Sequence, residues 1–161
     1  MSGAPLSPEG RLAALGIVLP PALSPVGRFA MAVRHGGLLY LSGQGPVLAD
    51  GTRLTGKVGA GVSEAEAAGH ARIVALNLLA AARAEIGSLD RIARIVKVLG
   101  FVNAAPDFTR HPAVINGCSE LLLDVFGPEA GRHARSAIGA GSLPGQITVE
   151  IEMVVALQGG A

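Results

Sequence analysis

The sequence predicts an α+β fold, in which a mixed β-sheet carries two long helices on one of its faces. Two segments with apolar residues at helical spacing are set among five runs that resemble strands, giving the order β-β-α-β-α-β-β. Most connections between them are short, and the 161 residues are a normal length for one domain. Half of the residues are hydrophobic, but only 3% are aromatic, so the core must consist mainly of Ala, Val, Ile and Leu.

The N-terminal part is expected to form a short helix that precedes the domain. Residues 7–16 begin with Ser7 as the N-cap and Pro8 in the first turn, and they end at Gly16. The following Pro20-Pro21 pair requires extended backbone. We therefore assign residues 1–24 to an N-terminal extension and residues 25–161 to a single domain.

The first half of that domain is predicted to be a hairpin followed by a helix. Apolar runs at residues 29–33 and 38–42 flank a turn at residues 34–37, and a glycine-rich loop follows them to residue 62. Ser63 to Glu66 is a capping box, in which the serine hydroxyl and the glutamate carboxylate satisfy free backbone N–H groups. The helix that starts there is expected to stop at Gly87.

The second half is predicted to be strand, helix and two strands. The strand covers residues 92–102, the helix covers residues 112–126 and ends at Gly127-Pro128, and the last strands cover residues 134–140 and 147–155. A hairpin centred between residues 142 and 143 would place Arg135 directly opposite Glu150. This arrangement favours either a structural cross-strand ion pair or an arginine that binds a ligand carboxylate, with Glu150 orienting a water molecule.

Composition narrows the possible functions. With 13 basic and 12 acidic residues the net charge is +1, which disfavours binding to nucleic acid or to an anionic membrane. The single cysteine, Cys118, rules out an internal disulfide and is expected to be a buried structural thiol. No phosphate-binding loop or metal-ligand spacing is found, so we expect no metal and no cofactor. Without a signal peptide or an apolar run of about 18 residues, a cytoplasmic protein is expected.

Low charge also predicts self-association. A sheet with helices on one face leaves its other face uncovered, and a chain with 16% charged residues is expected to cover that face with copies of itself.

Several motifs resemble the Rid (YjgF-type) family of reactive-intermediate deaminases. They are the Ser42-Gly43-Gln44-Gly45-Pro46-Val47 segment, Leu76 to Leu79, Val102-Asn103 through Phe108 to Asn116, and the block Ala134-Arg135-Ser136, Leu143-Pro144 and Val149 to Glu152. The resemblance covers about residues 25–157. The extension and Gly131 to His133 resemble a longer bacterial branch of the family.

This resemblance implies a chorismate-mutase-like fold and a homotrimer, whose sheets form a central barrel with clefts between subunits. It assigns Arg135 to the substrate carboxylate and Glu150 to the hydrolytic water, while Asn116, Ser42 and Gly43 line the cleft. Two positions depart from the family pattern, since Phe29 stands where tyrosine is common and Ala137 where cysteine is common. Both positions are still expected to contact the substrate.

The implied activity is hydrolysis of a 2-imino or enamino acid to a 2-oxo acid and ammonia. One alternative is a trimer that binds a small carboxylate or oxo acid without turnover. Another is ribonuclease activity or RNA binding, which the near-neutral charge and the few aromatic residues disfavour.

Overall fold

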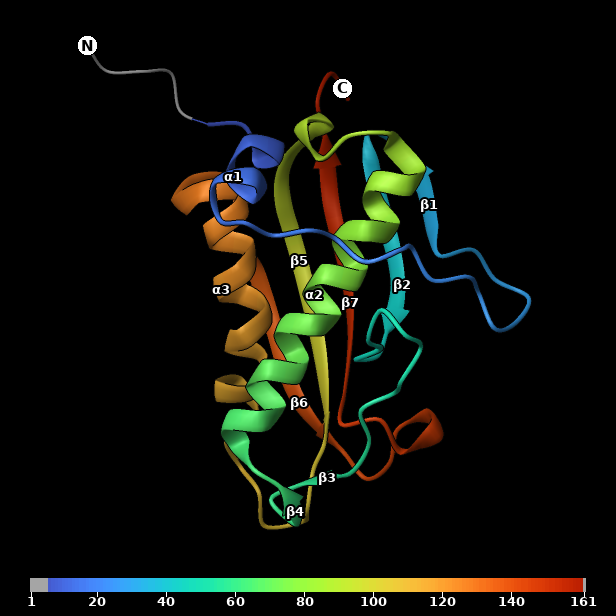
Figure 1. Cartoon of the computed structure of the whole chain (residues 1–161), viewed down its shortest axis with the longest axis vertical. Helices are drawn as coiled ribbons and strands as arrows, with labels where there is room; N and C mark the ends of the chain where they lie inside the picture. Colours follow the sequence, from blue (N-terminus) through green and yellow to red (C-terminus); the bar gives the residue numbers. More distant parts are fainter. Residues whose placement is uncertain (1–5, 161) are drawn as a thin grey trace.

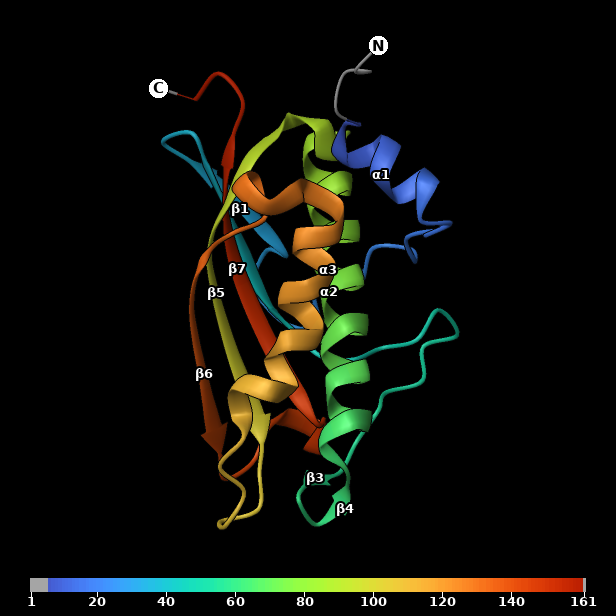
Figure 2. The ribbon, with the colours of Figure 1, turned by 90° about the vertical axis from the view of Figure 1, so that its left-hand side faces the viewer.

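A computed structural model describes residues 6–160 of the chain. Its main sheet has five strands in the order β1-β2-β7-β5-β6, and the two long helices cover one of its faces (Figures 1 and 2). Only β5 and β6 are parallel; the other neighbours are antiparallel. The bounds are α1 Pro8–Ala14, β1 Ala32–His35, β2 Leu38–Gln44, β3 Lys57–Val58, β4 Gly61–Val62, α2 Glu64–Ile86, β5 Ile92–Asn103, α3 His111–Ala130, β6 Ala134–Ala140 and β7 Val149–Leu157. The predicted α+β fold is confirmed.

The predicted starts of the first two helices are confirmed by their caps. Ser7 accepts a hydrogen bond from the Gly10 N–H at the start of α1. At the start of α2, Ser63 and Glu66 form both bonds of the capping box. The third helix runs further than expected, because Gly127 adopts a φ of 79° and lets a last turn continue past Pro128 to Ala130.

The first hairpin is shifted from its predicted position. The turn consists of Gly36 and Gly37, which both have positive φ and so suit a tight two-residue connection. As a result β1 begins at Ala32, and Phe29 lies before the strand. The short parallel pair β3 and β4 was not predicted.

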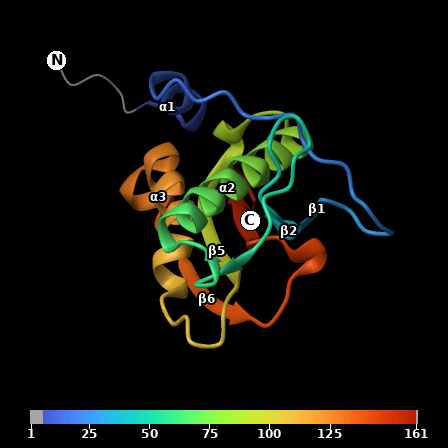
Figure 3. The same cartoon turned by 60° about the horizontal axis from the view of Figure 1, so that its bottom comes forward.

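The predicted pairing of the last two strands is wrong. β6 pairs in parallel with β5, and β7 lies on the other side of β5. Arg135 therefore lies opposite Val98, and Glu150 lies opposite Phe101. The strand-helix-strand unit β5-α3-β6 accounts for this, because its crossover returns the chain parallel to β5. The connection after β6 then passes the lower end of the sheet, through a 3-10 turn at Pro144–Gln146, before β7 enters the centre (Figure 3).

The helices bury a core of small and aliphatic residues. Val74, Leu78, Leu121, Leu122 and Ile151 are fully buried between the helices and the sheet. Leu12 of α1 belongs to the same core, although it lies in the predicted extension. A single apolar core thus joins α1, the long helices and the sheet.

No helix formed by residues 6–160 lies on the other face of the sheet (Figure 2). Large apolar side chains are exposed there, including Val33, Tyr40 and Ile138. Nowhere in residues 6–160 does a helix combine the length and the apolar character that crossing a membrane requires.

Candidate functional site

One group of polar side chains surrounds Arg135 near the edge of the sheet. Arg135 lies on β6, on the face that packs against α3. Its Nη1 atom donates to Asn116 Oδ1 at 2.8 Å and to Ser119 Oγ at 3.1 Å, and both acceptors come from α3. Among residues 6–160, no carboxylate forms an ion pair with this guanidinium. We call Asn116, Ser119, His133 and Arg135 the arginine group.

His133 and Ser119 are the members of this group that the sequence analysis missed. The Ser119 hydroxyl lies 3.0 Å from His133 Nε2, and His133 Nδ1 lies 2.7 Å from the Gly131 carbonyl oxygen. Because that carbonyl can only accept, Nδ1 donates, and in the neutral imidazole Nε2 accepts from Ser119. Burial lowers the pKa of His133, which favours this neutral form. Ser119 can thus accept from Arg135 while it donates to His133, which orients the guanidinium.

The Ser119 position could have been found from the sequence by its spacing. It follows Asn116 by three residues on the same helix, so the two side chains project from one helix face. No comparable local pattern links either residue to His133.

A second group surrounds Glu150 on β7. Its neighbours Val149 and Ile151 are fully buried, so the alternation of the strand points Glu150 toward the sheet's other face. The pairing of β2 with β7 is irregular between Leu41 and Gln44, and one extra residue is accommodated at Ser42–Gly43. The Glu150 carboxylate occupies the space where a side chain at position 43 would lie, so only glycine fits without displacing it.

Glu150 also lines a cavity of about 290 Å³, which we call the glutamate cavity. Its walls come from β2, the turn before β7 and the segment between α1 and β1, and its lining includes Phe29, Gly43, Arg53, Pro144 and Ile147. Burial, with a smaller contribution from the negative charge of Glu152, raises the pKa of Glu150. A carboxylate with a raised pKa is a better proton acceptor, which suits a general base.

The predicted site residues thus form two sets. Asn116 contacts Arg135, and Ala137 lies two residues further along the same face of β6, packed against the core. Phe29 and Gly43 line the glutamate cavity with Glu150. Ser42 borders this set, and its hydroxyl donates to the Ala30 carbonyl oxygen at 2.6 Å.

Within one chain the two sets of residues do not form one site. Arg135 and Glu150 lie on opposite faces of the sheet, two strands apart and three residues apart along β5, which places their Cα atoms about 14 Å from each other. The predicted juxtaposition of Arg135 and Glu150 is therefore wrong, and the alternative of a cross-strand ion pair within one chain is excluded with it. A single small ligand could contact both side chains only if they came from different copies of the chain.

Cys118 is a structural thiol, as predicted. It is fully buried in α3, and burial raises its pKa to about 12, although the nearby charge of Arg135 acts in the opposite direction. A thiol of this kind is not a nucleophile at neutral pH. Within residues 6–160, no three His, Cys, Asp or Glu side chains come together in a way that could hold a metal ion.

Comparison with known proteins places the chain among relatives of the same fold. Residues 9–153 match the family described as "YjgF/chorismate mutase-like, putative endoribonuclease". Protein TCP17 of Trypanosoma cruzi is 43% identical over 153 residues, which cover 92% of this chain and 96% of TCP17.

Two solved structures are similar over nearly their whole length. The protein Atu1372 of Agrobacterium tumefaciens, of unknown function, is 41% identical with a TM-score of 0.83, and the match covers 93% of this chain and 91% of Atu1372. A "putative endoribonuclease" of Shewanella oneidensis is 32% identical with a TM-score of 0.89, covering 94% and 99% of the two chains. The chain therefore belongs to the YjgF/chorismate mutase-like family.

Proposed function

We propose that this protein hydrolyses reactive 2-imino and enamino acids to 2-oxo acids and ammonia, in clefts between the subunits of a homotrimer. The proposal rests on the hydrogen-bond partners of Arg135. Its guanidinium is fixed through Nη1 by two neutral acceptors, Asn116 and Ser119, and none of the described carboxylates pairs with it. An oriented arginine of this kind can offer its other N–H groups to a ligand carboxylate in bidentate fashion.

The separation of the two sets supports a site that is shared between subunits. The exposed apolar face of the sheet provides a surface on which copies can pack, with Val33, Tyr40 and Ile138 exposed in the single chain. In a closed ring, the arginine group of one copy would meet the glutamate cavity of the next. Each cleft would then hold one carboxylate-binding arginine and one water-activating glutamate.

The reaction needs little from the protein beyond positioning. With the substrate carboxylate held by Arg135, water adds to the electrophilic imine carbon, and Glu150 accepts a proton from that water. Glu150 returns this proton to the imine nitrogen, which completes a neutral carbinolamine. The hydroxyl proton of the carbinolamine then passes through Glu150 to the amine, the C–N bond breaks, and the 2-oxo acid and ammonia leave, so that one water is consumed for each imine.

A coupled assay tests the activity directly. A pyridoxal-phosphate-dependent dehydratase generates 2-aminoacrylate, and the release of pyruvate is followed with and without this protein. Faster release supports the proposal. A trimer that is stabilised against thermal unfolding by 2-oxo acids, but leaves the lifetime of the imine unchanged, would instead be a binding protein.

Mixed trimers test the cleft between subunits. Arg135→Ala and Glu150→Gln should each be inactive, but a 1:1 mixture refolded together should recover activity. One cleft in four then receives an intact arginine and an intact glutamate from adjacent copies, so about a quarter of the wild-type rate is expected. No recovery from a well-mixed trimer, or a monomer in light scattering at micromolar concentration, would refute the arrangement.

The family's description also names an endoribonuclease, so RNA cleavage is measured separately for the wild type and for the same variants. The net charge of +1 gives little electrostatic attraction for a phosphate backbone. RNA cleavage that persists in Arg135→Ala and Glu150→Gln would require another site.

A further inference from the structure

The segment between α1 and β1 forms one wall of the glutamate cavity. It crosses the outer side of α2 and then loops out beside β1 and β2 before it enters the sheet (Figure 1). Five of the lining residues belong to it, namely Leu23, Ser24, Val26, Phe29 and Met31. Four of these five are apolar, whereas Glu150 and Arg53 are the only charged side chains among the described lining residues.

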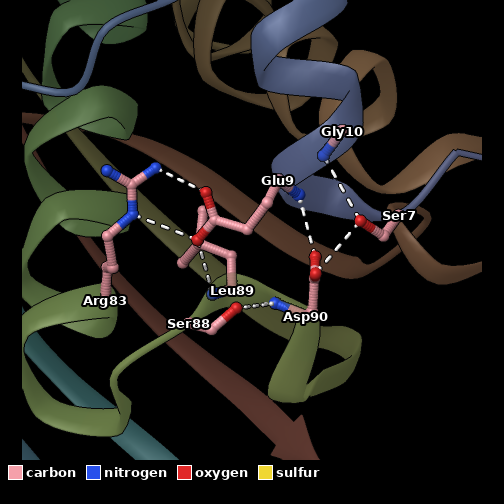
Figure 4. Close-up of polar contacts among 7 residues, drawn as sticks. All are labelled: Ser7, Glu9, Gly10, Arg83, Ser88, Leu89 and Asp90. Carbon is pink, nitrogen blue, oxygen red and sulfur yellow. Dashed lines mark hydrogen bonds and ion pairs between the residues drawn. The ribbon is translucent and has the colours of Figure 1, made fainter.

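Polar contacts of α1 hold the beginning of this segment in place (Figure 4). The Glu9 carboxylate accepts two hydrogen bonds from the Arg83 guanidinium, at 3.1 and 2.7 Å, and one from the Leu89 N–H at 2.9 Å. The Asp90 carboxylate accepts from the Ser7 hydroxyl at 3.0 Å and from the Glu9 N–H at 2.9 Å. These bonds attach α1 to α2 and to the turn before β5.

The end of the segment is attached to β2. Ser42 donates from its hydroxyl to the Ala30 carbonyl oxygen and from its N–H to the Met31 carbonyl oxygen at 3.0 Å. Between these attachments, residues 18–29 make no hydrogen bond to any other described residue. Val26, in the middle of this stretch, is 84% exposed in the single chain. The wall is thus anchored at both ends, while no hydrogen bond to another described residue holds its middle.

We propose that this wall receives the side chain of the substrate, and that the protein prefers 2-imino acids with apolar side chains to 2-aminoacrylate and other small imines. The inference rests on the proposed function. An imine carbon beside Glu150 carries three substituents, which are the nitrogen, the carboxylate and the side chain. With the carboxylate directed toward Arg135 of the adjacent copy, the side chain enters the glutamate cavity.

The size and lining of the cavity suit such a group. A volume of about 290 Å³ is at the lower end of the range for small-molecule sites. Each methylene transferred from water to an apolar wall favours binding by about fourfold. The side chain of the leucine-derived imine has three more carbons than that of the alanine-derived imine, so a preference of about 60-fold in kcat/KM is expected if all three are buried.

The experiment compares these two imines, generated in place by an L-amino acid oxidase from leucine and from alanine. Val26→Ser and Leu23→Ser should lower the leucine-to-alanine ratio of kcat/KM at least fourfold. Val18→Ser is the matched control, because Val18 lies on the same segment, is 89% exposed and does not line the cavity. Its ratio should equal that of the wild type.

A binding measurement separates this inference from the proposed function. Thermal unfolding is followed with 4-methyl-2-oxopentanoate and with pyruvate, and the larger oxo acid should stabilise the wild type at a lower concentration. Turnover with equal ratios in the wild type, Val26→Ser and Leu23→Ser would overturn the inference and leave the deaminase proposal intact. Selective binding of the larger oxo acid that Val26→Ser abolishes, without any turnover, would support the wall and refute the catalytic proposal.

Discussion

Replacing Arg135 by alanine distinguishes a ligand-binding arginine from a structural one. The structure gives this side chain two hydrogen bonds, to Asn116, which is exposed, and to Ser119, which is half-buried. A hydrogen bond from a charged donor contributes about 1.5–3 kcal/mol, and less where water competes. We therefore expect Arg135→Ala to lower the free energy of unfolding by about 1–2 kcal/mol.

This loss corresponds to a fall of about 2–8 °C in the melting temperature for a chain of this length. Breaking a buried ion pair with Glu150 would instead cost about 3–5 kcal/mol. The assay is thermal and urea unfolding at several protein concentrations, together with titration of a 2-oxo acid. We expect a folded oligomer that no longer binds the oxo acid or hydrolyses imines.

Two further variants sharpen the test. Arg132→Ala is the matched control, since it removes the same charge from an exposed position three residues away and should retain binding. Arg135→Lys keeps the charge but loses the planar fork, so binding and turnover should both fall at least tenfold. Unchanged imine turnover in Arg135→Lys would refute the assignment, and so would a loss above 4 kcal/mol in Arg135→Ala with oxo-acid binding retained.

Three more substitutions and one labelling experiment have defined outcomes. Glu150→Gln should abolish turnover yet raise the melting temperature at pH 7, because a raised pKa means that the folded state disfavours the charged carboxylate; this gain should vanish below pH 4, where the wild-type group is protonated in both states. Gly43→Ala should displace the Glu150 carboxylate and lower turnover at least tenfold, with nearly normal melting; full activity would show that the carboxylate position is not critical. Glu9→Gln should lower the free energy of unfolding by about 1–2 kcal/mol by weakening the hydrogen bonds to Arg83. An unchanged urea midpoint would contradict a stabilising role for these bonds between α1 and α2. Cys118 should not react with a thiol reagent in the native protein at pH 8 but should react after unfolding, whereas rapid native labelling would contradict its burial.

The Glu150 prediction extends to the pH dependence of catalysis. If the carboxylate accepts the proton from water, turnover should rise with pH, with a midpoint above the usual glutamate value of about 4.3. The measurement is kcat/KM between pH 4 and 8, corrected for spontaneous hydrolysis of the imine. A flat profile in this range would exclude Glu150 as the base.

Local sequence signals predicted the helices well. The capping box at Ser63 and Glu66 and the N-cap at Ser7 depend on contacts within a few residues, so short-range chemistry determines them. The alternation along β7 was also correct, since each buried residue is followed by one that points the other way. Arg135, Asn116 and Glu150 were chosen from sequence motifs that resemble the Rid family, whereas Ser119 and His133 were missed.

These local signals could not predict which strands pair. The turn residues between β6 and β7 favoured a hairpin, but the small-residue strand β6 pairs with β5 because α3 brings the chain back parallel to it. Local turn composition cannot show which neighbour a strand will find after a helical crossover. For this reason Arg135 and Glu150, which the sequence placed face to face, lie on opposite faces of the sheet.

The sequence by itself determined the α+β class, the capped starts of the first two helices and the residue types available for carboxylate binding and proton transfer, because each depends on periodicity, capping or side-chain chemistry. Only the tertiary structure decided which of these residues meet. It placed Ser119 and His133 behind Arg135, brought residues 23–31 against the glutamate cavity, and separated the cavity from the arginine group. These are contacts between residues distant along the chain, and they exist only once the crossover β5-α3-β6 has set the strand order and α1 is attached to α2 and to the turn before β5.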